Sequence, residues 1–346
     1  MARPSPSIAW IPSSQETRIA SVRLRSLLPC RYLTESGWRC ELTDARSCPD
    51  ADVVVFQKKY GPREIELAES LRDRDTVTVF DLCDNHFYNP DDRPELAARA
   101  ERLHRMIDLV DAVSVSTEPL RRLVPGKETA LIDDAFDEVA ARRTSTWRRR
   151  LSGATRRGGE LRLVWYGNAG LVSPSFGLRH VRRVVPVLEE LASRRRLRLT
   201  VISNSREVFQ QVLGDARFPT EYHEWKEATF AELFTEQDVC IIPIEENPFT
   251  VAKTSNRVTL SLRLGVPVVA DPIPSYEELA PFVLLGDWAE SIERYAADPA
   301  LRRRHAREGR AYVEAKYTRQ RVADQWSSFF ERLLALSPRT AARRSA

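Results

Sequence analysis

The stretch KTSNRVTLSLRLGVPVVADP, residues 253–272, decides how the second half of this chain folds. After its polar beginning, apolar and polar residues alternate, and strict alternation predicts a half-buried strand. On a helix the same apolar residues form two stripes at i,i+4 spacing, Val258 with Leu262 and Leu260 with Leu264. Such a helix would pack between two layers of the protein and bury apolar side chains on both sides, whereas the strand would bury only one face.

The neighbouring strands favour the helix. Apolar runs predict strands at residues 238–244 and 266–270, the second bounded by a glycine and an aspartate. Parallel strands need a crossover connection, and a helix is the usual one. We therefore predict a helix over residues 256–264, with Ser255 as its N-cap.

The same alternation of strands and helices runs through the whole chain. In the first part, β-branched runs predict strands at residues 7–11, 52–56, 76–82, 112–116 and 129–134. The pattern starts again at residues 161–167, after a segment with seven arginines and no acidic residue between 142 and 157. A chain of 346 residues also exceeds the usual size of a single core. The sequence thus predicts two α/β domains with parallel sheets.

The predicted division follows these patterns. It consists of an N-terminal domain (1–141), an arginine-rich linker (142–158), a C-terminal domain with terminal helices (159–336) and a disordered tail (337–346).

Composition excludes several classes of protein. The 53 Lys+Arg against 49 Asp+Glu give a charge of only +4, which does not indicate a nucleic-acid binder. The five cysteines have no regular spacing, so neither a zinc site nor a disulfide framework is indicated, and a reducing cytoplasm fits best. No uncharged run approaches the ~20 residues that span a bilayer. We expect a cytoplasmic protein, or one in peripheral contact with the inner face of the cytoplasmic membrane.

Lys253 and the first turn of the predicted helix are a candidate anion site. A helix N-terminus contributes ~0.3–1 kcal/mol to a nearby anion, and an ammonium at about 4 Å adds ~4 kcal/mol at an effective dielectric of about 20. The cluster follows the strand at residues 238–244, at the carboxyl end where ligands bind in open α/β sheets. An ordinary surface loop with a capping serine is the alternative.

The run from residue 253 to 278 resembles the nucleotide-binding segment of glycosyltransferases with two facing Rossmann-like domains, the B-type (GT-B) architecture. Further similar stretches are LRLVWYGNAG (161–170), LRRRHAREGRAYVEAKYT (301–318), RIASVRLRSLLPCRYL (18–33), ADVVVFQKKY (51–60) and VFDLCDNHFY (79–88). The chain is thus similar to bacterial nucleotide-sugar-dependent glycosyltransferases of the family 4 and family 1 group. The resemblance implies C-terminal helices that pack back across the two domains.

The resemblance also implies a reaction and a donor site. The reaction is a hexosyl transfer from a nucleotide-diphosphate sugar to a hydroxyl acceptor, without a metal or a cofactor. The donor diphosphate is expected at Lys253, Ser255, Asn256 and Arg257, because negative charge builds on the leaving oxygen. The loop that starts with Gly167 and Asn168 lets backbone approach the ligand, with an ordinary strand-to-helix turn as the alternative.

One departure from the family concerns two glutamates. Retaining members carry them eight residues apart, at positions that hold Ala252 and Leu260 here. We expect the contacts with the donor sugar and ribose to come from Glu245 or Glu246, or to be absent. Inversion and retention both remain open. A catalytically silent GT-B-like nucleotide-binding module and a sugar-nucleotide 2-epimerase are the alternative functions.

Polar residues directly after the apolar run TVTVF (76–80) are the candidate acceptor-side groups. His86 could take the hydroxyl proton because its ordinary pKa lies near neutrality, and Asp81 or Asp84 could orient it or act instead. A capping role is the alternative, and the spacing matches no standard metal site. Arg18 and Arg23 are expected to hold a phosphate of the donor or of a lipid-linked acceptor, with a solvated helix face as the alternative.

The remaining assignments concern the nucleotide base and the partners. His223 and Trp225 close a strand where the family often contacts the base, although a core tryptophan is the alternative. His180 and His305 lie in arginine-rich helical stretches and are expected at the surface. The partners are a nucleotide-sugar donor and a saccharide or lipid-linked acceptor, in bacterial surface polysaccharide or glycolipid synthesis. The arginine-rich segment is either a solvated hinge or a patch for anionic lipid headgroups.

Overall fold

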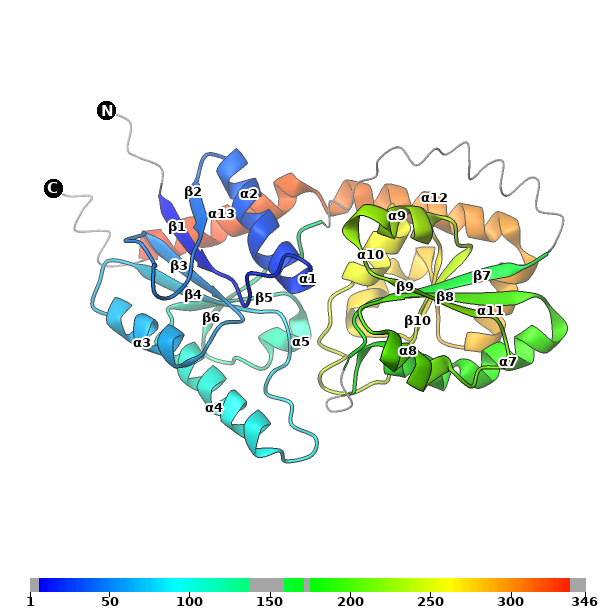
Figure 1. The fold of residues 1–346 in the computed structure, drawn as a ribbon. Coiled ribbons are helices and arrows are strands. Elements are labelled where there is room, and N and C mark those ends of the chain that lie inside the picture. Colours follow the sequence, from blue (N-terminus) through cyan, green and yellow to red (C-terminus); the bar gives the residue numbers. More distant parts are fainter. Residues whose placement is uncertain (1–5, 137–158, 171–174, 337–346) are drawn as a thin grey trace. The chain divides into compact units, whose positions relative to one another are not determined.

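The computed structural model describes residues 6–136, 159–170 and 175–336, which form two compact units (Figure 1). The first unit contains the described residues of 1–137, 252–254 and 316–346, and the second those of 138–251 and 255–315. The predicted linker (142–158) and tail (337–346) lie outside the described residues. Each unit is built around one parallel sheet, as the alternation of strands and helices predicts.

The sheet of the first unit has six parallel strands in the order β2-β1-β3-β4-β5-β6. They are β1 (Ser7–Ile11), β2 (Arg39–Leu42), β3 (Val53–Gln57), β4 (Val77–Leu82), β5 (Ala112–Val115) and β6 (Glu128–Leu131). The chain leaves β1 toward β2 and then crosses to β3 on the other side. The loops after β1 and β3 therefore diverge, and such a switch point is where open α/β sheets bind ligands.

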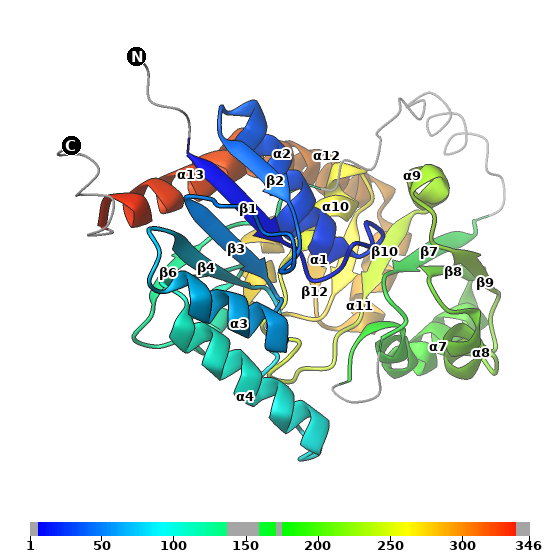
Figure 2. The ribbon, with the colours of Figure 1, turned by 60° about the vertical axis from the view of Figure 1, so that its left-hand side comes forward.

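Helices cover both faces of this sheet (Figures 1 and 2). They are α1 (Ala20–Val22), a π-helical turn η1 (Arg23–Leu27), α2 (Leu28–Glu35), α3 (Pro62–Leu71), α4 (Pro94–Leu109), α5 (Glu118–Arg121) and α13 (Arg319–Leu336). Helices α3 and α4 pack side by side, and α13 packs against α2.

The last helix belongs to the first unit, whereas the predicted division gave residues 159–336 to the second domain. Its apolar face is the physical reason. The ring of Trp326 meets that of Trp10 of β1 edge-on at 4.7 Å, and both side chains are fully buried. An aromatic pair of this kind fixes α13 on the sheet beyond what buried area alone contributes.

The sheet of the second unit also has six parallel strands, in the order β12-β11-β10-β7-β8-β9. They are β7 (Leu161–Tyr166), β8 (Leu197–Ser203), β9 (Thr220–Glu224), β10 (Val239–Ile242), β11 (Val268–Ala270) and β12 (Leu284–Leu285). The chain moves outward from β7 in one direction and then from β10 in the other. This is the strand order of dinucleotide-binding folds, with the switch point between β7 and β10.

The helices of the second unit include the one that the opening stretch predicts. They are η2 (Gly177–Arg183), α7 (Val185–Arg194), α8 (Arg206–Leu213), α9 (Glu227–Thr235), α10 (Asn256–Arg263), η3 (Pro274–Phe282), α11 (Trp288–Ala297) and α12 (Pro299–Lys316). The predicted helix is thus confirmed as α10. Its stripe of Val258 and Leu262 is fully buried, but Leu260 and Leu264 are only half-buried, so the prediction of a helix enclosed on both sides is wrong for the second stripe.

Candidate functional site

The loop after β7 lies at the switch point of the second sheet and is folded tightly. Gly170 has φ +85°, and a Cβ there would lie 1.8 Å from the carbonyl oxygen of Phe176. Gly177 has φ +88°, and its Cβ would lie 2.6 Å from the carbonyl oxygen of Asn168. Both positions therefore require glycine. The backbone of the Gly167–Gly170 turn therefore packs directly against the backbone at the start of η2, with no room for a side chain between them.

Arg257 of α10 lies beside this loop. Its guanidinium is stacked over the rings of Trp165 and Tyr166, at 4.9 and 5.4 Å, and a Cβ at Gly167 would be 3.6 Å from its Cζ. The Nε and one terminal nitrogen of Arg257 are buried without a hydrogen-bond partner in the described part of the chain. Unsatisfied buried donors are rare, and each one calls for an explanation such as a bound ligand. The structure thus brings together two of the predicted donor-site residues, Gly167 and Arg257.

The first turn of α10 is only partly as predicted. Ser255 occupies the N-cap position, and its carbonyl oxygen accepts from the Thr259 N–H at 2.9 Å, but its side chain caps no backbone N–H. The first N–H groups of a helix have no partner within the helix. Those of Asn256 and Arg257 are therefore available to an anion, which is the role the sequence predicts for this turn.

Side chains hold the backbone after β10 in place. Asp271 accepts from the Ile244 N–H at 2.7 Å, and Arg183 donates to the Ile244 carbonyl. The next peptide N–H, that of Glu245, donates to Nδ1 of His180 at 3.2 Å. Both His180 and Arg183 come from η2, where residues three apart project side by side. The Glu245 loop is thus fixed from the neighbouring helix, with the Glu245 side chain itself 54% exposed.

His180 is a residue that sequence reasoning missed. We expected it at the surface, but it is 3% exposed, and His305 is also buried, against Tyr295. The arginine-rich composition of η2 hid the inward-facing His180, because its neighbours Arg182 and Arg183 are exposed. The spacing His-x-x-Arg, with both residues on one edge of such a helix, is the signal that could have revealed it. Glu246, the other predicted sugar contact, is exposed.

In the first unit, Asp84 is the centre of a charged cluster at the carboxyl end of β4. It accepts from Lys58 at 2.6 Å and from Lys253, and the side chain of Asp84 is 13% exposed. Burial opposes ionisation of Asp84, but Lys253 and Lys58 outweigh it and lower its pKa below the ordinary value. Lys58 follows β3 at the switch point of this sheet and was not among the residues predicted from the sequence.

His86 lies close to this cluster and is neutral near pH 7. Its Nδ1 is 2.6 Å from the hydroxyl of Tyr60, and burial lowers its pKa to about 3 despite the opposing effect of Asp84. A neutral imidazole can accept a proton, but a general base works best when its pKa lies near the working pH. The geometry therefore supports His86 as a hydrogen-bonding group more strongly than as the predicted base.

Asp81 has a structural environment. Its side chain is 0% exposed and accepts from the guanidinium of Arg25 at 2.5 Å and from the hydroxyl of Ser114 at 2.8 Å. Arg25 is itself buried and also donates to the carbonyl of Ile132 at 2.6 Å. A carboxylate enclosed in this way contacts no ligand, so the geometry argues against Asp81 as a catalytic group.

The two predicted phosphate-binding arginines have different surroundings. Arg18 is 76% exposed and pairs with Glu16 at 2.6 Å. Arg23, in the π-helical turn, is 9% exposed and donates to the carbonyl of Thr17 at 2.8 Å. Both residues flank the loop after β1. A shared phosphate stays a prediction for this pair.

The predicted base-binding residues lie at the end of the edge strand β9, with His223 inside the strand and Trp225 directly after it. His223 lies 2.9 Å from Glu221, and half-buried Trp225 contacts the ring of Phe230 at 6.4 Å between centroids. They lie two strands from β7, which is about 10 Å at the usual strand spacing. Contact with a nucleotide base stays a prediction for both residues.

The segment 252–254 is bound along the carboxyl edge of the first sheet. Thr117, after β5, donates to the carbonyl of Ala252 at 3.0 Å. Lys253 pairs with Asp84, after β4. Thr254 donates to Asp134 at 2.6 Å. Three successive residues are thus fixed by three different connections of the first unit, which explains why this segment belongs to it.

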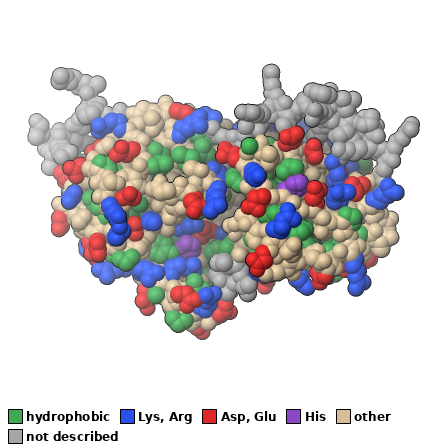
Figure 3. Space-filling view, in the orientation of Figure 1, with side chains coloured by type: hydrophobic (Ala, Val, Ile, Leu, Met, Phe, Trp, Pro, Cys, Tyr) green, Lys and Arg blue, Asp and Glu red, His purple; other side chains and the backbone are tan. Residues whose placement is uncertain are grey.

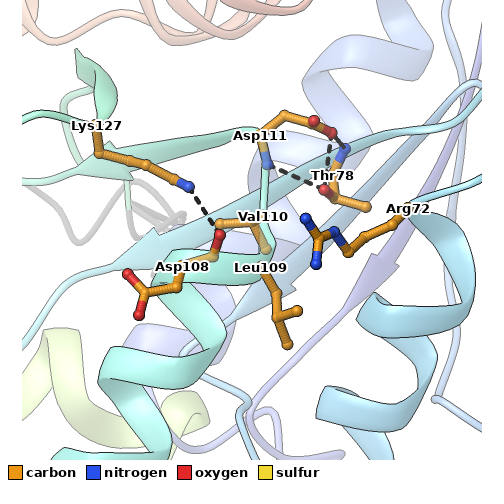
Figure 4. Close-up of a pocket in the computed structure, with 7 residues that line it drawn as sticks. All are labelled: Arg72, Thr78, Asp108, Leu109, Val110, Asp111 and Lys127. Atoms are coloured by element: carbon orange, nitrogen blue, oxygen red, sulfur yellow. Dashed lines mark hydrogen bonds between the residues drawn. The ribbon is translucent and has the colours of Figure 1, made fainter.

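A pocket of about 360 Å³ lies at the other end of the first sheet (Figure 4). Thr78, Asp111 and Lys127, at the amino ends of β4, β5 and β6, line it together with Arg72. Asp111 accepts from the Thr78 N–H and hydroxyl at 2.7 and 2.8 Å. Because ligands of such sheets bind at the carboxyl ends, we do not assign this pocket to the candidate site.

Three further features of the described residues concern surface charge, metal ligands and membrane spans. Basic and acidic side chains are interspersed over the face in Figure 3, in keeping with the small net charge. Within residues 6–136, 159–170 and 175–336, no group of three or more histidines, cysteines and carboxylates could hold a metal ion. No helix in the same ranges is long and apolar enough to cross a membrane.

Comparisons with known proteins identify the fold. No protein-family model matches the chain, and no curated protein matches it in sequence. Among solved structures, a glycosyltransferase from Rickettsia africae aligns with a TM-score of 0.67 at 10% identity, over 97% of this chain and 100% of that one. A trehalose-6-phosphate structure from E. coli, bound with UDP-2-fluoro glucose, aligns with a TM-score of 0.61 at 11% identity, over 94% and 98%.

A third similar structure is larger. TarM aligns with a TM-score of 0.61 at 11% identity over 80% of this chain, which spans only 54% of the TarM chain. At these identities the alignments establish the architecture. Together with the two parallel six-stranded sheets, they confirm the predicted class, and the chain has the GT-B fold of glycosyltransferases with two Rossmann-like domains.

Proposed function

We propose that this protein transfers a hexose from a nucleoside-diphosphate sugar to a hydroxyl acceptor. The observation that carries the proposal is the arrangement at the switch point of the second sheet. There the Gly167 turn, the first turn of α10 with Arg257 and the loop with Glu245 come from the carboxyl ends of β7 and β10. The E. coli structure with the same fold is bound with UDP-2-fluoro glucose, which supports a nucleotide-sugar donor.

The donor diphosphate is assigned to backbone N–H groups and cations. Breaking the bond to the sugar leaves negative charge on the diphosphate, and positive groups stabilise that charge in the transition state. The side chain of Arg257 and the backbone N–H groups of Ser255, Asn256 and Arg257 supply it at the start of α10, and Lys253 lies just before this helix in the chain. The proposed reaction uses no metal and no cofactor.

The acceptor is assigned to the first unit. The Asp84 cluster, with Lys58 and His86, offers cationic and hydrogen-bonding groups at the carboxyl end of the sheet. Deprotonation of the attacking hydroxyl belongs to Asp84 or His86 in this proposal. The proposed acceptor is a saccharide or a lipid-linked saccharide of a bacterial surface polysaccharide or glycolipid. We also propose a peripheral membrane contact through the arginines of 142–157.

The first test is thermal unfolding with UDP, GDP, ADP and dTDP. A ligand at about 100 times its Kd stabilises the native protein by ~2.7 kcal/mol, which is a readable shift. We expect one nucleotide to stabilise the wild type, and Arg257→Ala and Lys253→Ala to lose most of the effect. Arg263→Ala, at the other end of α10, is the matched control.

The second test is release of the nucleoside diphosphate from its sugar ester in the presence of saccharide acceptors. Release that depends on the acceptor supports transfer. Nucleotide binding without any transfer would indicate the silent binding module instead. If no nucleotide shifts the wild-type transition, the proposed function is wrong.

A further inference from the structure

Ser175, His180 and Glu245 form a closed hydrogen-bonded ring in the second unit. The backbone N–H of Glu245 donates to Nδ1 of His180 at 3.2 Å. Nε2 of His180 lies 2.9 Å from the hydroxyl of Ser175. That hydroxyl lies 3.2 Å from the carboxylate of Glu245. The ring therefore starts at the backbone of Glu245 and returns to its side chain.

The donors and acceptors in this ring follow from its geometry. Nδ1 of His180 accepts from a backbone N–H, so it carries no proton, and in the neutral imidazole the proton is on Nε2. Nε2 then donates to Ser175, whose single hydroxyl proton is left for Glu245. His180 thus cannot activate Ser175 as a nucleophile. Instead, the histidine and the serine together fix the orientation of the carboxylate.

The surroundings favour this neutral state. His180 is 3% exposed, and burial lowers its pKa, while Glu245 opposes and Arg183 and Arg257 reinforce that shift. The backbone on either side is also fixed, because Asn247 donates to the carbonyl of Ser175 at 3.2 Å. By contrast, the Glu245 carboxylate is half-exposed. The ring is a rigid, buried support for one accessible carboxylate at the switch point.

We propose that His180 is a positioning residue which, through Ser175, holds the Glu245 carboxylate ready to accept hydrogen bonds from hydroxyl groups of the transferred sugar. A carboxylate repels a diphosphate and is a strong acceptor for sugar hydroxyls, so its contribution belongs to the sugar part of the donor. This inference rests on the proposed function and assigns one part of the donor to one ring of residues. Glu245 would also supply the carboxylate that this chain lacks at positions 252 and 260, which hold Ala252 and Leu260.

The test compares two affinities for each variant by calorimetry: that for the free nucleoside diphosphate, and that for its glucose and mannose esters. The wild type should bind a sugar ester more tightly than the free nucleotide. Glu245→Gln, His180→Ala and Ser175→Ala should each reduce the ratio of the two affinities by about tenfold, with the affinity for the free nucleotide unchanged. His180→Gln, which retains a donor near the position of Nε2, should restore part of the ratio.

A control and a second variant keep the test decisive. His305→Gln changes a buried histidine of the same unit that bonds Tyr295 instead, so its ratio should equal that of the wild type. If His180→Ala does not fold, Ser175→Ala, which removes a single hydroxyl, decides the question.

Three results would overturn the inference. One is a ratio that falls in Glu245→Gln but not in His180→Ala or Ser175→Ala. Another is a wild type that binds the nucleotide without any preference for its sugar esters, which leaves the nucleotide site of the proposed function intact. The last is a wild type that binds neither ligand, which refutes the proposed function as well.

Discussion

The ammonium nitrogen of Lys58 lies 2.6 Å from a carboxylate oxygen of Asp84, whose other oxygen bonds Lys253. Lys58 adopts φ 53° directly after β3, an unusual conformation for a residue with a side chain. The surrounding structure therefore holds Lys58 in place against this strain. Together the two lysines favour the ionised form of Asp84 and lower its pKa.

Replacing Lys58 with methionine should reduce this stabilisation. Lys58 helps to keep the pKa of Asp84 below its unfolded value of about 3.9. The stability that this ion pair contributes is therefore fully present above about pH 4, and it is lost as the pH falls from there toward the lower pKa of the folded state. We expect a loss of about 1–3 kcal/mol at pH 7 that narrows below about pH 4. Urea unfolding at pH 7, 5 and 3 measures it. Lys59→Met, at the next position, is the control and should change stability by less than ~0.5 kcal/mol.

His86 should titrate far below an ordinary histidine. Its pKa is lowered to about 3, so the native state binds fewer protons than the unfolded state between that value and about 6.5. His86 therefore makes stability rise with pH through this window, and His86→Gln should flatten the rise. The imidazole C–H signals in NMR spectra provide the measurement, with His86→Gln assigning the resonance. A midpoint near 6.5 would show that His86 is solvated and would strengthen its proposed role as the base.

Breaking the Arg25–Asp81 pair on one side only should strongly destabilise the first unit. Arg25→Met leaves a buried carboxylate without its counter-ion, which costs about 3–5 kcal/mol. The double variant Arg25→Met/Asp81→Leu should recover most of that loss, because a buried ion pair is replaceable by apolar groups of similar size. Arg18→Met, which removes an exposed pair, should cost less than ~1 kcal/mol. Urea denaturation of the four proteins gives the comparison, and equal stabilities for both single arginine variants would refute the structural role of Arg25.

Replacing Gly170 and Gly286 separates two energetic costs, that of the left-handed backbone conformation and that of a steric clash with the added Cβ. Both have positive φ, +85° and +67°, but a Cβ at Gly286 meets nothing within 4 Å, whereas at Gly170 it meets Phe176. Gly286→Ala should cost about 1–2 kcal/mol for the left-handed conformation alone. Gly170→Ala should cost clearly more and weaken nucleotide binding, because the turn must open. Unfolding and nucleotide titrations of both variants test this, and identical costs would contradict the tight turn.

The sequence predicts the central strands of this fold better than its edges. Strands β3 and β4 are buried along their whole length, so they appear as continuous β-branched runs. Edge strand β2 is mostly exposed and β12 has two residues, so neither produces an apolar run, and both were missed. The apolar face of α13 was visible, but a hydrophobic face does not specify its partner. That choice depends on the ring of Trp10, more than 300 positions away.

The candidate site was found in part for a similar reason. Polar residues and glycines after strands are visible in a sequence, which revealed Asp84 and Gly167. The same rule applied to β3 would have revealed Lys58. Pairings between distant segments are not visible. Nothing local indicates that Lys253 bonds Asp84, or that Asp81 is enclosed by Arg25.

The first unit draws its residues from three separated parts of the chain, whereas the second is interrupted only at 252–254. During synthesis on the ribosome, the sheet that contains β1 is made before the second unit but lacks α13, whose Trp326 covers Trp10, until residues 319–336 have emerged. The last strand of the second unit, β12, ends at Leu285, so all strands of that unit are made before α13. We therefore expect the order of folding to run against the order of synthesis, with the second unit formed while the first still exposes an apolar face to chaperones.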